Sequence, residues 1–70
     1  MTKTDYVDYY IEILQDMCIL TKRATRKERV VRDILSACAD EYEMSRKLHD
    51  LYVDNITLDG FMDKYGGALV

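Results

Sequence analysis

The feature with the clearest chemical character is a basic cluster in the middle of the chain. Between Lys22 and Arg32 there are six basic residues and one acid, Glu28, which gives a local charge of +5. The rest of the chain sums to −8, so the net charge is −3. We take the whole cluster as the candidate partner-binding site: Lys22, Arg23, Arg26, Lys27, Arg29 and Arg32.

Three of these residues lie where a helix disfavours them. Arg26, Lys27 and Arg29 follow the expected start of a helix, and positive charge there opposes the helix dipole at a cost of up to ~1 kcal/mol each. An anionic partner, either nucleic-acid phosphate or an acidic protein surface, would explain their presence. The alternative interpretation is a solvated turn that is basic for solubility.

Nucleic acid fits the sequence less well than a protein partner does. The isoelectric point is about 4.9, far below the values above ~9 typical of dedicated nucleic-acid domains. The basic cluster also lacks interleaved aromatic residues on which single-stranded bases could stack. We therefore expect another protein as the partner, with nucleic acid as the alternative.

The remaining reactive residues predict no metal, cofactor or catalytic site. Cys18 and Cys38 are not spaced as CxxC, and His49 is the only histidine, so the usual tetrahedral zinc set cannot be assembled from one chain. Both cysteines lie in apolar stretches and are predicted to pack as small hydrophobes, in the core or at an interface, without forming a disulfide within one chain. A glycine-rich phosphate loop and the spacing of a nucleophilic triad are both missing, so we expect a protein that is not an enzyme and has no cofactor.

Composition and hydrophobic periodicity predict an all-α fold in a single domain spanning residues 1–70. The chain has no proline, three glycines and 49% apolar residues. Apolar residues at helical spacing predict a first helix over about 4–21, with Thr2 or Thr4 as its N-cap. Thr25 and Glu28 form a capping-box signature, which starts a second helix at Arg26.

The second helix is predicted to be longer than the first. Its apolar pattern continues to Asn55, so a helix over about 26–54 would be ~43 Å long against ~27 Å for the first. In an antiparallel hairpin, its far end needs cover from a short third helix over about 57–65, capped by Thr57 and ended by Gly66-Gly67. Asn55 is expected to take the left-handed turn conformation, and a break near Ala39–Glu43 is the alternative to one long helix. The tail residues predicted to pack are Leu58, Phe61, Met62 and Tyr65.

The first helix has more apolar residues than a hairpin can cover. They surround most of its circumference, whereas a helix in a simple hairpin needs a stripe of only ~100°. A homodimer in which two hairpins form a helical bundle would bury the excess. The alternative is that several tyrosines are ordinary surface residues. The predicted self-association residues are Tyr10, Ile11, Leu14 and Cys18.

Three short stretches resemble a known family. Thr2-Lys3-Thr4-Asp5-Tyr6, Ala39-Asp40 and Leu51-Tyr52 are similar to the corresponding parts of the small helical Hha/YmoA family. The distance from the opening motif to Asp40 is shorter here, and the tail from Thr57 has no counterpart. The resemblance implies a cytoplasmic bacterial protein that binds the nucleoid protein H-NS and modulates gene silencing, with Asp40 as the position that matters.

Taken together, the sequence predicts a small regulatory protein that binds another protein through its helical surfaces. An adaptor, inhibitor or antirepressor encoded by a phage, another mobile element or a bacterium is the leading interpretation. The alternatives are a nucleic-acid-associated regulator that uses the basic cluster and a modulator of the Hha/YmoA type. No apolar run approaches the ~18 residues of a membrane span, so we expect a cytoplasmic location without membrane association.

Overall fold

The described part of the chain contains four α-helices followed by a short π-helical turn. The computed structural model describes residues 2–23 and 25–66. The elements are α1 (Lys3–Asp16), α2 (Arg26–Ser36), α3 (Glu41–Tyr52), α4 (Leu58–Phe61) and the π-helical turn η1 (Met62–Gly66). No strand occurs in these two ranges, and the all-α prediction is confirmed.

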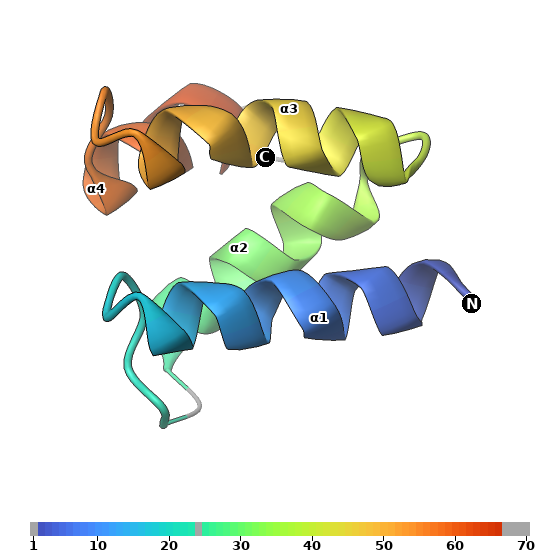
Figure 1. The fold of residues 1–70 in the computed structure, drawn as a ribbon, viewed down its shortest axis with the longest axis horizontal. Coiled ribbons are helices and arrows are strands. Elements are labelled where there is room, and N and C mark those ends of the chain that lie inside the picture. Colours follow the sequence, from blue (N-terminus) through green and yellow to red (C-terminus); the bar gives the residue numbers. More distant parts are fainter. Residues whose placement is uncertain (1, 24, 67–70) are drawn as a thin grey trace.

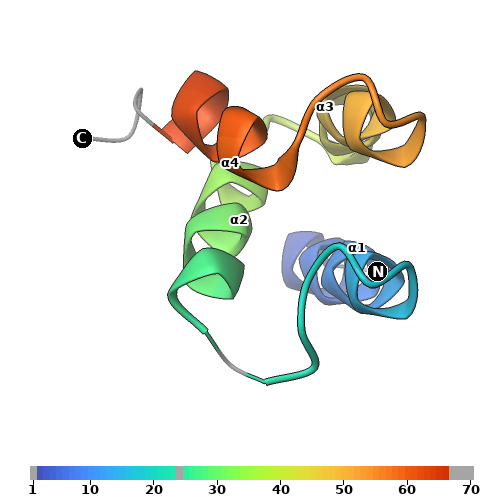
Figure 2. The same ribbon diagram turned by 90° about the vertical axis from the view of Figure 1, so that its left-hand side faces the viewer.

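The helices are arranged around α2. Helices α1 and α3 run in the same direction, and α2 crosses obliquely between them (Figure 1). Viewed from the side, α1 and α3 are seen end-on, while α2 covers one side of both and α4 with η1 lies beside α3 (Figure 2). The expected hairpin with one long second helix is therefore wrong, because the chain turns back after α2 and places α3 alongside α1.

The break between α2 and α3 has a local cause in Asp40. This residue is the N-cap of α3, and its Oδ1 accepts a hydrogen bond from the backbone N–H of Glu43 at 2.9 Å. The Glu43 carboxylate reaches back and accepts from the backbone N–H of Ala39 at 2.7 Å. These reciprocal bonds satisfy amide groups that a helix start leaves without partners. The break, at residues 37–40, overlaps the alternative position near Ala39–Glu43, and the continuous helix over 26–54 is wrong.

Helix α1 ends earlier than expected because Cys18 adopts the left-handed conformation, with φ of 61°. The Ile19 N–H donates to the Leu14 carbonyl at 2.9 Å, and the Cys18 N–H donates to the Gln15 carbonyl at 3.0 Å. This pair of bonds defines a Schellman motif, in which the left-handed position usually belongs to glycine. The chain therefore leaves the helix five residues before the predicted end at Thr21.

Helix α3 ends with the same motif. Asp54 has φ of 61°, so it takes the left-handed conformation that the sequence assigned to its neighbour Asn55. The Asn55 N–H donates to the Asp50 carbonyl at 2.9 Å, and the Asp54 N–H donates to the Leu51 carbonyl at 3.3 Å. The position of the turn after α3 is thus predicted correctly, but the left-handed residue is Asp54 and not Asn55.

The core is formed by residues from all four helices, with two more from the segments after α1 and α2. These residues are less than a tenth exposed, and Phe61 of α4 is the largest of the fully buried ones. Burial of such apolar surface is the main stabilising contribution in a domain of this size. The buried residues are Val7, Tyr10, Ile11, Leu14, Leu20, Val31, Ile34, Leu35, Cys38, Met44, Leu48, Leu51 and Phe61.

The tail closes this core from the side of α2. Thr57 caps α4, since its Oγ1 accepts from the Gly60 N–H at 3.1 Å. Phe61 is buried, while Leu58, Met62 and Tyr65 are partly buried and pack against the core. A Cβ on Gly66 would lie 3.4 Å from the Val30 side chain of α2, so η1 is seated directly on that helix. Gly66 has no positive φ, and Gly67 lies outside the described residues.

Candidate functional site

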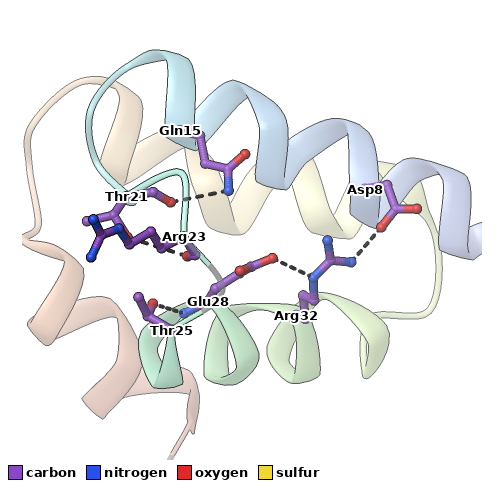
Figure 3. Close-up of polar contacts among 7 residues, drawn as sticks. All are labelled: Asp8, Gln15, Thr21, Arg23, Thr25, Glu28 and Arg32. Carbon is purple, nitrogen blue, oxygen red and sulfur yellow. Dashed lines mark hydrogen bonds and ion pairs between the residues drawn. The ribbon is translucent and has the colours of Figure 1, made fainter.

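The basic cluster surrounds the loop between α1 and α2 and the first turns of α2. Lys22 and Arg23 lie in the loop, and Arg26, Lys27, Arg29 and Arg32 lie on α2. We call these six residues the basic tip. Helix α2 begins at Arg26 because Thr25 caps it, and Thr25 Oγ1 accepts from the Glu28 N–H at 3.2 Å (Figure 3). The predicted cap is thereby confirmed.

Arg32 of the basic tip is held by two carboxylates. Its Nε donates to Glu28 Oε1 at 3.0 Å, one turn earlier on α2, and its guanidinium also donates to Asp8 Oδ1 of α1 at 2.5 Å (Figure 3). The hydrogen bond to Asp8, followed by that to Glu28, raises the pKa of Arg32 above its usual value. Arg32 therefore fastens α2 to α1, and its charge is already neutralised within the chain.

Lys27 also has a partner within the chain, though a weaker one. Its Nζ lies 3.5 Å from Asp59 Oδ1 of α4. Both side chains are more than half exposed, and exposed pairs of this kind contribute ~0–1 kcal/mol. The pair bridges the N-terminal ends of α2 and α4.

Four basic residues of the tip remain uncommitted. Lys22, Arg23, Arg26 and Arg29 are exposed, and none of them forms an ion pair with a residue in 2–23 or 25–66. Arg26 and Arg29 lie in the first turns of α2, where the helix dipole disfavours positive charge. These four side chains provide charged hydrogen-bond donors for carboxylate or phosphate groups.

The loop that carries Lys22 and Arg23 is held at two points. Gln15 Nε2 donates to the Thr21 carbonyl at 3.2 Å, and the Thr21 hydroxyl donates to the Arg23 carbonyl at 3.4 Å (Figure 3). A surface depression of about 550 Å³ follows α2 beside this loop, and both Arg26 and Arg29 line it. Arg26 and Arg29 thus stand at a concave surface that Arg32, Glu28 and Asp33 also line.

The residues predicted to mediate self-association are placed differently. Tyr10, Ile11 and Leu14 are buried within one chain, on the helix α1 that packs against α2. Tyr10 also donates a hydrogen bond from its hydroxyl to the Glu41 carboxylate of α3. These side chains keep little exposed surface in the single chain, and their assignment to self-association stays a prediction. Cys18 is exposed and takes no part in this cluster.

The two cysteines have different environments. They form no disulfide with each other, as predicted. Cys38 is buried, its Sγ donates to the Ile34 carbonyl at 3.4 Å, and burial raises the pKa of its thiol. The prediction that a cysteine packs in the core is confirmed for Cys38, while Cys18 lies outside the core and its packing at an interface stays a prediction. His49 is exposed on α3, and within residues 2–23 and 25–66 no three His, Cys, Asp or Glu side chains form a group that could hold a metal ion.

Asp40, the position indicated by the family resemblance, is exposed. Its carboxylate is occupied by the capping bond to the backbone of α3 described above. A substitution at Asp40 would therefore change the start of α3 as well as any surface that this residue contributes to a partner.

Sequence reasoning found the basic tip but missed how it divides. The partners of Arg32 and Lys27 are 24 and 32 positions away at Asp8 and Asp59, and such pairs leave no periodic signal in the sequence. Only the Glu28–Arg32 pair has the i, i+4 spacing that could have been recognised.

Comparisons with protein-family models, curated proteins and solved structures find no match to this chain. Within the described residues, none of the helices combines the length and the apolar character that crossing a membrane requires.

Proposed function

We propose that this chain is a small, non-enzymatic regulatory protein that binds an acidic surface of another protein through its basic tip. The observation that carries the proposal is the division among the six basic residues. Arg32 and Lys27 are paired with acids, while Lys22, Arg23, Arg26 and Arg29 are exposed and form no ion pair with a described residue.

The placement of Arg26 and Arg29 supports binding over folding as the reason for their charge. At the start of α2 each opposes the helix dipole, by up to ~1 kcal/mol. An anionic partner would offset this unfavourable interaction, because its charge attracts both side chains. Charge complementarity also speeds the encounter of two proteins and disfavours wrong partners. The proposed adaptor, inhibitor or antirepressor role requires nothing more than such a surface.

An acidic protein fits this surface better than nucleic acid does. Outside residues 22–32 the chain carries a charge of −8, which repels a long polyanion but is tolerated by a partner that touches the tip alone. The aromatic side chains of the described residues lie on α1, α3, α4 and η1, and none belongs to the loop or to α2. Base stacking, which single-stranded nucleic acid requires for tight binding, therefore has no support at the tip.

The test compares two sets of charge reversals in affinity capture from a nuclease-treated host extract. The double variant Arg26→Glu/Arg29→Glu is expected to keep or slightly raise the melting temperature and to lose the captured protein. Arg46→Glu is the matched control, because Arg46 is exposed on α3 outside the tip. Capture that survives the double variant would contradict the proposal, and capture that nuclease abolishes would favour nucleic acid instead.

A further inference from the structure

Beside the basic tip lies an apolar hollow of about 380 Å³. It opens at the junction of the α1–α2 loop with the start of α4, and its apolar walls come from Ile19, Leu20 and Leu58. Leu20 is buried, whereas Ile19 and Leu58 are half-buried, so their remaining apolar surface faces the hollow. The volume is at the lower end of the ~300–1,000 Å³ typical of ligand pockets.

Basic residues stand at the rim of this hollow. Arg26 and Lys27 line it together with Thr21 and Thr25. Arg23 follows closely in the same loop, and its carbonyl is bonded to the Thr21 hydroxyl. An apolar hollow whose rim carries the Asp59-paired Lys27 and Arg26, which forms no ion pair with a described residue, is complementary to an apolar side chain flanked by carboxylates.

We propose that this hollow receives one apolar side chain from an acidic segment of the partner protein. Arg23 and Arg26 pair with the carboxylates on either side of that anchor. The inference rests on the proposed function, and it adds the chemistry of the partner: an acidic, amphipathic segment rather than a merely acidic surface. Interface anchors of this kind, buried in a pocket and surrounded by polar contacts, carry most of the affinity in many complexes.

The chemistry of the hollow separates this occupant from nucleic acid. Its three apolar side chains are aliphatic, so they offer a sugar or phosphate no hydrogen-bond partner and a base no aromatic ring to stack on. The basic rim without the hollow would suit any polyanion. The combination of rim and hollow selects a chain that has both carboxylates and an apolar side chain.

The experiment uses three fluorescein-labelled helical peptides and fluorescence anisotropy. The first is rich in glutamate with one central leucine, the second has alanine in place of that leucine, and the third keeps the leucine but has glutamine in place of glutamate. We expect the first to bind about tenfold more tightly than the second, which corresponds to ~1.4 kcal/mol. We expect the third to bind most weakly and to lack the salt dependence of the other two.

The site of binding is read from the methyl resonances of the protein. The leucine peptide should shift the methyl signals of Ile19, Leu20 and Leu58, and the alanine peptide should not. Leu48, which is fully buried in α3, is the control signal that should not move. Ile19→Thr keeps the branched shape of the side chain and should reduce the preference for leucine over alanine, with the melting temperature as the check on folding.

The outcomes distinguish this inference from the proposed function. Equal binding of the leucine and alanine peptides, lost in Arg26→Glu/Arg29→Glu, would overturn the hollow as an anchor site and leave the acidic-protein function standing. Tight, salt-dependent binding of single-stranded nucleic acid together with no binding of either acidic peptide would overturn both. Occupation of the hollow by a second copy of the chain would also overturn the inference. It would be seen as dimers in sedimentation, together with a shift of the Ile19 methyl signal when the dimer forms.

Discussion

Replacing Cys18 by glycine should stabilise this protein. Cys18 holds the left-handed position of the Schellman motif that ends α1, with φ of 61°. For a residue with a Cβ this conformation costs roughly 1–2 kcal/mol. Glycine removes that cost but adds freedom to the unfolded chain, which lowers stability by about 0.4–1 kcal/mol. Because the Cys18 side chain is exposed, its loss removes little buried contact.

The expected net gain is about 0.5–1 kcal/mol, which is large against the roughly 3–5 kcal/mol that a core of this size supplies. For a domain of this length, each kcal/mol raises the melting temperature by about 4–8 °C. The assay is thermal and urea unfolding of the full chain followed by circular dichroism. A gain in the urea midpoint without a change of slope would show that stability itself has changed.

Cys18→Ala is the matched control for the loss of the thiol. Alanine keeps a Cβ in the left-handed conformation, so its stability should stay within about 0.5 kcal/mol of the original chain. The stabilising effect is therefore the difference between the glycine and alanine variants. If the alanine variant gained as much as the glycine variant, or if glycine lowered the melting temperature, the left-handed termination of α1 at Cys18 would be refuted.

Four further predictions concern polar side chains between the helices. Tyr10→Phe should lower the free energy of unfolding in urea by about 0.5–1.5 kcal/mol, because it removes the hydrogen bond to Glu41. Tyr52→Phe should be neutral or stabilising in the same assay. The Tyr52 hydroxyl is buried and has no hydrogen-bond partner among the described residues. Burial and then the bond to Glu41 raise the pKa of Tyr10 to about 12. The folded state thus holds this proton more tightly than the unfolded chain does. Stability should therefore be unaffected below pH ~10 and fall as the pH rises from ~10 to ~12. An absorbance titration should show a tyrosine that ionises near the upper end of this range, and Tyr10→Phe should remove it. Arg32→Met should lower stability by up to ~1 kcal/mol, a modest loss because both of its ion pairs are partly exposed. The same change should leave partner capture intact. Unchanged stability with lost capture would place Arg32 in the interface instead.

The sequence predicted the helix starts better than the helix ends. Thr25 and Thr57 cap helices as expected, since a threonine side chain before an apolar run acts through local chemistry alone. The end of α1 carried no such signal, because Cys18 occupies a position where glycine is the recognisable residue.

The break after α2 did carry a signal, in Asp40 and Glu43, but helical periodicity masked it. Apolar residues continue at helical spacing through Ile34, Cys38 and Tyr42, so the pattern reads as one helix. Periodicity indicates which residues are buried, but it does not indicate whether the helix is continuous. Two short helices that fold back on each other can bury the same residues as one long helix. The dimer was predicted from the apolar residues that surround the first helix, and it stays a prediction.

The basic tip shows most clearly what sequence alone leaves undecided. Six basic residues in eleven positions are equivalent in a count of charges, yet the fold gives them separate roles. Arg32 joins α2 to α1 through Asp8, and Lys27 reaches Asp59 on α4, so both charges act within the chain. Arg26, which forms no ion pair with a described residue, instead lines an apolar hollow whose walls come from two distant segments. Charge reversal at Arg32 should therefore lower stability, whereas charge reversal at Arg26 should weaken binding. The two effects separate because Asp8 and Asp59 pair with Arg32 and Lys27 and leave Arg26 without an acidic partner among the described residues.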